Sequence, residues 1–152
     1  MTLHEKLLAM LDARGVVYDT HHHEPTYTSA DASRIRQVSL HEGAKALVIR
    51  GAKSKTHYLF VMPADLRLDS KKVSALIGEK FSFAPDPEAV CGCVPGSVPP
   101  FGSLLGLCMF CDHRLSENTS IHFNAASLTD SVTMTYADYL RVENPTLVDC
   151  TA

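Results

Sequence analysis

The sequence predicts a mixed α/β fold of the α+β type: a single domain over residues 1–152, with a mixed, partly closed sheet flanked by helices. Short apolar runs rich in β-branched residues recur along the chain, and they predict about six or seven strands. Between them stand helix-capping residues followed by apolar residues at helical spacing. A length of 152 residues is that of one ordinary domain, and no repeat, low-complexity tract or linker divides it.

The N-terminal half begins with a helix signal. Thr2 and Glu5 form a capping box, an apolar stripe runs from Leu3 to Leu11, and Gly15 is a natural stop. The elements expected up to residue 62 are a helix over 3–11, a strand over 16–20, a loop over 21–27, a helix from Thr28 to residue 35, and strands over 46–50 and 57–62 joined by the polar residues 51–56.

The C-terminal half alternates in the same way. Asp69 is a helix N-cap, and Asp86 before Pro87 is a typical helix start. The run from Leu104 to Phe110 is continuously apolar, which predicts a strand buried on both faces. The elements expected here are helices between Asp69 and Gly78, between Asp86 and Gly92 and over 136–140, and strands over 81–83, 104–110, 120–124 and 131–135.

Composition narrows the class of protein. Charged residues make up 20% and hydrophobic residues 45%, as in soluble globular proteins. No apolar run approaches the length of a membrane span, and the N-terminus lacks a signal-peptide core, so we expect a cytoplasmic protein without a membrane partner. Five cysteines are an odd number, so we expect free thiols rather than a full disulfide framework.

Charge is unevenly distributed along the chain. The net charge of −3 argues against strong general affinity for nucleic acid, and no DNA partner is expected. Residues 45–80 nevertheless carry eight basic and three acidic side chains. This segment is either a solvated hairpin tip and helix face or a patch that meets phosphates. Charge alone favours the solvated face.

Two separated segments carry the most specific chemistry. Residues 43–49 (GAKALVI) place the lone Lys45 at the mouth of an apolar, β-branched run, where its ammonium is expected near a pocket wall. Residues 96–102 (GSVPPFG) form a stiff loop, because proline fixes φ and removes N–H donors while glycine permits conformations closed to other residues. Such a loop can bind a ligand through its backbone groups alone.

Five pieces of the chain, in this order and spacing, make up a family pattern. They are His23-Glu24-Pro25 followed by Thr28, the segment 43–49, Pro63-Ala64-Asp65 followed by Leu68-Asp69, the loop 96–102, and Phe123-Asn124-Ala125-Ala126-Ser127. With these pieces the chain resembles the YbaK-like aminoacyl-tRNA deacylases, relatives of the editing domain inserted in bacterial prolyl-tRNA synthetases. The resemblance covers nearly the whole chain and implies the YbaK/prolyl-tRNA synthetase-associated domain fold.

The resemblance also implies an activity. It implies hydrolysis, in trans, of the ester of a mischarged aminoacyl-tRNA, namely tRNA-Pro or a related tRNA that carries a small amino acid, without cofactor or metal. An activated ester needs only a positioned water and a stabilised oxyanion, so the absence of a Ser-His-Asp or Cys-His pattern is no obstacle. An aminoacyl-tRNA synthetase is a further possible partner. A rival function is that of a non-catalytic module that binds an aminoacyl or nucleotide-like ligand.

Site residues are carried over from the family position by position. Lys45 is expected to anchor the substrate, and Gly96 of the Gly-x-x-x-Pro pattern to orient the substrate or the attacking water. The expected substrate-binding residues are His23, Thr28, Ser97, Val98, Pro99, Pro100, Phe101, Gly102, Ser127 and Leu128. The basic segment supplies the expected tRNA-binding residues, which are Arg50, Lys53, Lys55, Lys71 and Lys72.

The chain departs from the family at Ala126 and Leu128, where relatives often have glycine and histidine. His122 is close in sequence, but strand alternation turns it to the face opposite Ile121 and Phe123, so it is a poor substitute. If Leu128 lines the pocket, it cannot hydrogen-bond a hydroxyl group, and an alanyl ester is then expected to be preferred to a seryl ester.

Histidine and cysteine clusters raise the alternative of a metal site. Because side chains alternate in an extended chain, only His21 and His23 of the three consecutive histidines can face one ion, and a polar loop at a pocket rim is the simpler interpretation. Cys91, Cys93, Cys108 and Cys111 form two close pairs, but the second pair lacks the glycine turn of a zinc knuckle. A zinc-stabilised structural domain is therefore disfavoured, and so is a catalytic cysteine, since no local feature depresses a thiol pKa.

Overall fold

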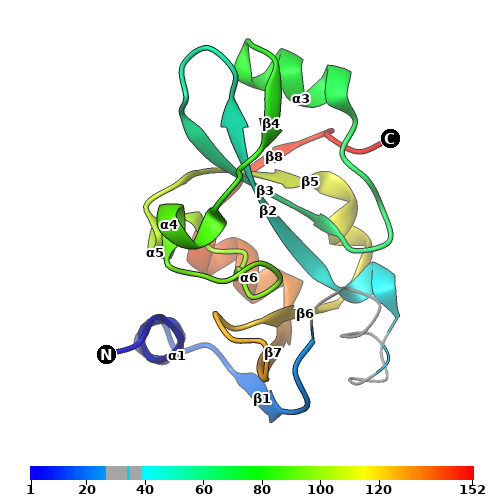
Figure 1. The fold of residues 1–152 in the computed structure, drawn as a ribbon. Coiled ribbons are helices and arrows are strands. Elements are labelled where there is room, and N and C mark those ends of the chain that lie inside the picture. The colour runs from blue at the N-terminus through cyan, green and yellow to red at the C-terminus, as the bar shows by residue number, and fades with distance from the viewer. Residues whose placement is uncertain (27–33, 35–38) are drawn as a thin grey trace.

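The strands form two sheets that lie one above the other in Figure 1. The structure is a computed structural model that describes residues 1–26, 34 and 39–152. Within these residues the smaller sheet has the strand order β1-β7-β6, and the larger has the order β4-β2-β3-β5-β8. The predicted mixed α/β class is confirmed, with the strands divided between two sheets.

The bounds of the elements follow. The strands are β1 Tyr18–His22, β2 Ala44–Gly51, β3 His57–Pro63, β4 Phe81–Phe83, β5 Cys108–Asp112, β6 Ser120–Asn124, β7 Asp130–Thr135 and β8 Thr146–Val148. The α-helices are α1 Leu3–Ala13, α3 Ser70–Ile77, α4 Pro87–Cys91, α5 Gly102–Leu105 and α6 Tyr136–Glu143, and the 3-10 helices are η1 Leu40–Glu42 and η2 His113–Glu117. No helix among the described residues is long and apolar enough to cross a membrane.

Local signals in the sequence set most helix ends. The predicted capping box is present, because Thr2 accepts a hydrogen bond from the N–H of Glu5 and the Glu5 carboxylate accepts one from the N–H of Thr2. Asp69 caps α3, and Gly78 ends it in the left-handed conformation at φ 78°. Asp86 caps α4 immediately before Pro87.

Some elements differ from the prediction in their bounds or were not predicted. The strand expected over 104–110 begins only at Cys108, because its first residues form α5, which Gly106 ends at φ 70°. Strand β1 starts later than expected and includes His21 and His22, which pair with β7. Strand β8 was not predicted, since its three residues acquire strand geometry only by pairing with β5. Apart from residue 34, the helix expected from Thr28 to residue 35 lies outside the described residues.

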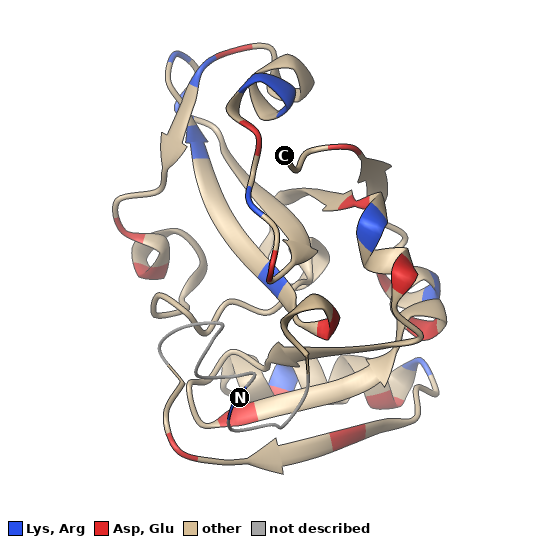
Figure 2. Cartoon of the chain, turned by 90° about the vertical axis from the view of Figure 1, so that its right-hand side faces the viewer, with Lys and Arg blue, Asp and Glu red and all other residues tan. Residues whose placement is uncertain are grey.

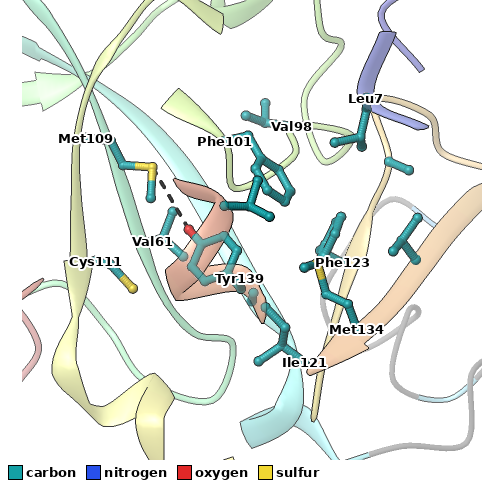
Figure 3. Packing of buried hydrophobic residues seen from close by; sticks show 14 of the residues in the cluster. Leu7, Val61, Val98, Phe101, Met109, Cys111, Ile121, Phe123, Met134 and Tyr139 are labelled. Atoms are coloured by element: carbon teal, nitrogen blue, oxygen red, sulfur yellow. Dashed lines mark hydrogen bonds between the residues drawn. The ribbon is translucent and has the colours of Figure 1, made fainter. Parts of the chain in front are cut away.

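The larger apolar cluster joins the two sheets. Figure 3 shows Val98, Phe101, Phe123 and Tyr139 pointing toward one another in this cluster. The Phe101 ring lies 5.3 Å from Phe123 and 5.3 Å from Tyr139, with both contacts edge-to-face. The buried Tyr139 hydroxyl donates to the Pro100 carbonyl at 2.6 Å, so its burial leaves no unpaired polar group. A second cluster packs on the other face of the larger sheet, beneath α3.

A buried carboxylate fastens the C-terminal segment. Asp112 is fully buried, and its Oδ2 accepts from the N–H of Cys150 at 3.0 Å and from the Thr151 hydroxyl at 3.1 Å. Its Oδ1 accepts from the N–H of Arg114 at 2.9 Å. Burial alone raises the pKa of Asp112, but hydrogen bonds to the charged form outweigh it and hold the pKa below its ordinary value.

Asp112→Asn is therefore expected to destabilise the fold by about 3 kcal/mol, because a neutral amide cannot accept all of these hydrogen bonds. Urea denaturation at pH 7 measures the loss. Since the folded-state pKa of Asp112 is lowered, its contribution is fully present above the unfolded-state pKa of about 3.9 and is lost as the pH falls through the folded value. The variant's stability should change less than the wild type's over that acid range. Asp19→Asn, at an exposed position on β1, is the control and should leave the midpoint unchanged.

Candidate functional site

The backbone of the loop 96–102 is held in fixed directions at its start. Gly96 has φ +86°, a left-handed conformation that favours glycine. Its carbonyl accepts a hydrogen bond from the Asn124 side-chain amide at 2.5 Å. Ser97 is buried, and both its N–H and its hydroxyl donate to the Val94 carbonyl, at 3.0 and 2.8 Å. The loop therefore presents an exposed glycine on a rigid support.

The end of the same loop is fixed by the core. The side chains of Val98 and Phe101 are buried in the larger cluster, where they hold the loop in place. At Gly102 a Cβ atom would lie 2.6 Å from Met109 Cβ and 2.7 Å from the Leu107 carbonyl oxygen, so only glycine fits. If this loop binds substrate, as the sequence predicts, its backbone near Gly96 is better placed to do so than these buried side chains.

Asn124 is a site residue that sequence reasoning missed. It ends β6, and besides donating to Gly96 it accepts from the Thr26 hydroxyl at 3.3 Å. The N–H of Thr26 donates to the Leu128 carbonyl at 2.8 Å. Asn124 thus links the glycine loop to the turn after β6. The available signal was a polar residue at the end of an apolar strand, inside the Phe123 to Ser127 piece of the family pattern.

His23 and Ser127 lie in the same neighbourhood. The N–H of His23 donates to the Thr129 carbonyl at 2.8 Å, and its Nε2 lies 3.2 Å from the Ser131 hydroxyl. The Ser127 hydroxyl donates to the Asp130 carboxylate at 2.7 Å. The structure therefore brings together four of the predicted site residues, namely His23, Gly96, Ser127 and Leu128. Thr28, a fifth, lies outside the described residues.

Lys45 belongs to the larger sheet and lies next to the point where the two sheets meet. It lies on β2 opposite Met62 and is partly buried. Two residues earlier, Gly43 forms a parallel bridge with His122 of β6. Lys45 and Asn124 each lie two residues beyond that bridge on strands that run in the same direction. No carboxylate of the described residues forms an ion pair with the Lys45 ammonium.

The edge of β2 beside Lys45 carries free backbone groups. In an antiparallel pair, alternate residues direct both polar groups to the partner strand or away from it. Gly43 accepts from Ala64 on the β3 side, whereas Val48 accepts from Ala84 on the opposite edge. Ala46 therefore directs its N–H and carbonyl toward the opposite edge. Because β4 pairs with β2 only over residues 49–51, no strand of the described residues covers Ala46 there.

Two histidines hold η1, the 3-10 helix immediately before β2, in place. His122 is buried, and its Nε2 lies 3.1 Å from the Glu42 carboxylate of η1. The ring of His41, also in η1, contacts Asp65 at 2.9 Å and Glu117 at 3.0 Å. The hydrogen bond with Asp65 raises the pKa of His41 above its ordinary value, which favours a charged ring between two carboxylates. The predicted alternation is observed, since His122 contacts Glu42 whereas Ile121 and Phe123 are buried in the larger cluster.

Lysines and arginines lie along the β2–β3 hairpin and α3, as Figure 2 shows. Lys53 and Lys55 are exposed at the hairpin tip, and Lys71 is exposed on α3. Lys72 pairs with Asp149 at 3.0 Å, and the buried Nε of Arg50 has no hydrogen-bond partner. None of these contacts involves the residues around Gly96, and only part of the basic segment is free to meet phosphates.

The cysteines do not gather into a metal site. Among the described residues no group of three His, Cys, Asp or Glu side chains is placed to hold a metal ion. One expectation is wrong, however: a local feature does depress a thiol pKa. The hydrogen bond from the Cys93 thiol lowers the pKa of Cys91 to about 7, while Cys93 itself has a raised pKa because of that contact and its burial.

Ala126 occupies a glycine conformation. Its φ is +59°, in the left-handed region where a Cβ atom is strained. The resemblance described above implies glycine at this position, and the positive φ is a backbone reason for it.

We expect Ala126→Gly to stabilise the fold by about 1 kcal/mol, because it removes this strain. The urea denaturation midpoint measures the change. Ala9→Gly, at an exposed position in the middle of α1, is the matched control and should lower stability by about 1 kcal/mol, since glycine disfavours a helix interior. Equal losses in both variants would contradict the assignment of strain to Ala126.

Known proteins that are similar to this chain in sequence are described as tRNA editing proteins or deacylases. The sequence profile of the aminoacyl-tRNA editing domain matches residues 23–142. The chain is 35% identical over 152 residues to the multifunctional Ser/Thr-tRNA deacylase ProXp-y of Escherichia coli (strain K12), with 96% of this chain and 91% of that protein covered. It is 32% identical over 107 residues to the prolyl-tRNA editing protein ProX of Acetoanaerobium sticklandii, with 68% and 65% covered.

A solved structure assigned to a trans-editing enzyme for prolyl-tRNA synthetase has the same fold. It superposes with a TM-score of 0.84 over 100% of this chain and 98% of that one, at 21% identity. At that level of identity the likeness concerns the fold alone.

Proposed function

The chain belongs to the aminoacyl-tRNA editing domain family, and from that membership we propose that it hydrolyses, in trans, the ester bond of mischarged aminoacyl-tRNA. The family predicted from the sequence is thereby confirmed. We further propose that residues 1–152 act as one editing domain in the cytoplasm, where charged tRNA is found. A synthetase that delivers the tRNA is a compatible partner.

The observation that supports the proposal is the parallel bridge between Gly43 and His122, from which the strands that carry Lys45 and Asn124 run in the same direction. Lys45 supplies a positive charge that no described carboxylate neutralises. It is suited to the developing oxyanion or to the terminal ribose phosphate of the substrate. The Ala46 N–H and carbonyl, on the same open strand edge, are suited to dock the substrate beside it. The Gly96 loop, held by Asn124, orients the acyl group or the attacking water.

We propose that the acyl group is small and carries a hydroxyl, as in serine or threonine. Ser127, Thr129 and Asp130 form a hydrogen-bonded cluster in the turn next to Asn124, and such a cluster can satisfy a substrate hydroxyl. The relative of 35% identity is named a Ser/Thr-tRNA deacylase. The alternative expectation, a preference for an alanyl ester, depends on Leu128 alone. The measurement below decides between a seryl and an alanyl preference.

Lys45→Ala is expected to lower the deacylation rate of the best mischarged tRNA by about 100-fold or more, because it removes the free charge at the site. Lys45 is only partly buried at a strand edge, so the variant should fold and keep its urea midpoint. The assay is release of the amino acid from a panel of mischarged tRNAs.

Two matched variants sharpen this test. Lys45→Met keeps the aliphatic chain and should be as inactive as Lys45→Ala, whereas Lys45→Arg keeps the charge and should retain more activity. Near-wild-type turnover by Lys45→Met would exclude an electrostatic role. If the wild type binds aminoacyl-tRNA but releases no amino acid from any member of the panel, the chain is the non-catalytic binding module instead.

The acyl preference is measured with one tRNA body charged with either serine or alanine. We expect the wild type to hydrolyse the seryl ester faster, and Ser127→Ala to reduce that ratio about 10-fold, since an unpaired buried hydroxyl costs about 1–3 kcal/mol. A wild-type preference for the alanyl ester that Leu128→His reverses would assign the specificity to Leu128 and overturn this choice.

A further inference from the structure

A hollow of about 640 Å³ lies between α3 and the edge strand β4. Its lining includes Phe81, Ser82 and Phe83 from β4 and Lys71 and Ser74 from α3. The hollow is separate from the Gly96–Asn124 cluster, and none of the contacts described above uses it. Its walls combine aromatic rings, serine hydroxyls and lysine ammonium groups.

An exposed aromatic pair forms the apolar part of this hollow. Phe83 is 58% exposed, the highest value for an aromatic side chain among the described residues. Its ring lies 6.3 Å from that of Phe81 at an interplanar angle of 88°, and Phe81 packs into the cluster beneath α3. Phe81 thus supports a ring whose own face is open to a ligand. A flat ring held in this way is a stacking platform for a nucleobase.

Uncompensated positive charge surrounds the rings. Lys71 and Lys80 line the hollow, and neither forms an ion pair with a described carboxylate, in contrast to Lys72 with Asp149. The nearest carboxylates in sequence are already used by backbone groups. Asp69 accepts from two N–H groups of the first turn of α3, and Glu79 accepts from the N–H groups of the hairpin residues 53 and 54. The hollow therefore attracts an anion that carries a flat apolar group.

The hollow and the proposed ester site lie along the same strand, β2. Phe83 pairs with Ile49, so its side chain lies on the same face of the sheet as those of Ile49, Leu47 and Lys45. Four residues of strand separate Ile49 from Lys45, which is about 13 Å at 3.3 Å per residue. The unpaired 3′ end of a tRNA, whose terminal ribose carries the ester, can bridge such a distance.

We propose that this hollow binds an unpaired base of the tRNA acceptor end, stacked on Phe83, with Lys71 and Lys80 on the flanking phosphates. The proposal rests on the proposed function for the identity of the nucleic acid. The lysine ammonium groups can pair with phosphates, and the serine hydroxyls can hydrogen-bond to the edge of a base. An acidic peptide paired with the β4 edge is the competing occupant that the test includes.

The first experiment measures binding without catalysis. A fluorescently labelled, uncharged acceptor minihelix is titrated with protein, with and without its unpaired 3′ nucleotides. We expect Phe83→Ala to weaken binding of the complete minihelix about 10-fold and to leave binding of the truncated one unchanged. Phe83→Tyr should restore affinity, because it keeps the ring. Leu147→Ala, at an exposed apolar position on β8, is the matched control and should have no effect.

The charge is tested by salt dependence. Lys71→Ala with Lys80→Ala should reduce the slope of log K against log salt by about 1.4, as expected for two contacts to a single strand. Lys6→Ala, an exposed lysine on α1, should not change the slope. The proposal is overturned if Phe83→Ala weakens both minihelices equally, if it behaves like Leu147→Ala, or if an acidic peptide competes while the minihelix does not bind.

The second experiment separates this proposal from the proposed function. Hydrolysis of mischarged tRNA by Phe83→Ala should show a KM about 10-fold higher at unchanged kcat, while hydrolysis of the same amino acid esterified to adenosine alone should be unaffected. If the wild type binds the minihelix through Phe83 but hydrolyses neither ester, the proposed function fails and the base site stands. If the wild type is active and Phe83→Ala matches Leu147→Ala on tRNA, the base site fails and the activity stands.

Discussion

The bridge between Gly43 and His122 is the contact on which the site depends. It joins the start of β2 in the larger sheet to β6 in the smaller one. The junction is tight, because a Cβ atom on Gly43 would lie 3.2 Å from both Ala64 Cβ and the Leu40 carbonyl oxygen. From this point the two strands carry Lys45 and Asn124 forward together. The positions of the proposed catalytic lysine in one sheet and of the polar anchor in the other thus depend on one backbone contact and on the His122–Glu42 pair next to it.

The glycine loop shows how a rigid surface is built from a hydrophobic core. Its side chains at Val98 and Phe101 are buried with Phe123 and Tyr139, so the chain cannot shift without opening the cluster. Its exposed end is held by the hydrogen bond from Asn124 to Gly96. Apolar packing fixes where the loop lies, and a polar contact fixes the direction of its carbonyl. Such pre-organisation suits the hydrolysis of an already activated ester, in which positioning does most of the work.

The proposed base site and the proposed ester site lie toward opposite ends of β2. Four lysines without a described ion pair, Lys53, Lys55, Lys71 and Lys80, lie at the hairpin and α3 end, whereas Asn124 ends a strand of the smaller sheet. An acidic protein can therefore hold a polyanion locally without general affinity for nucleic acid. Strand β2 spans the two regions, with Lys45 near one end and Ile49, opposite Phe83, toward the other.

The mixed α/β class, the helix caps at Thr2, Asp69 and Asp86, and the two segments that carry Lys45 and Gly96 can be predicted from the sequence. These are local properties, since capping, strand composition and the stiffness of a Gly-Pro loop depend on neighbouring residues. The remaining features depend on how the chain folds in three dimensions. The tertiary structure divided the strands between two sheets, created β8 by pairing it with β5, and selected Asn124 as the anchor of Gly96. Each of these features depends on contacts between residues that are distant in sequence. Local sequence patterns do not predict such contacts.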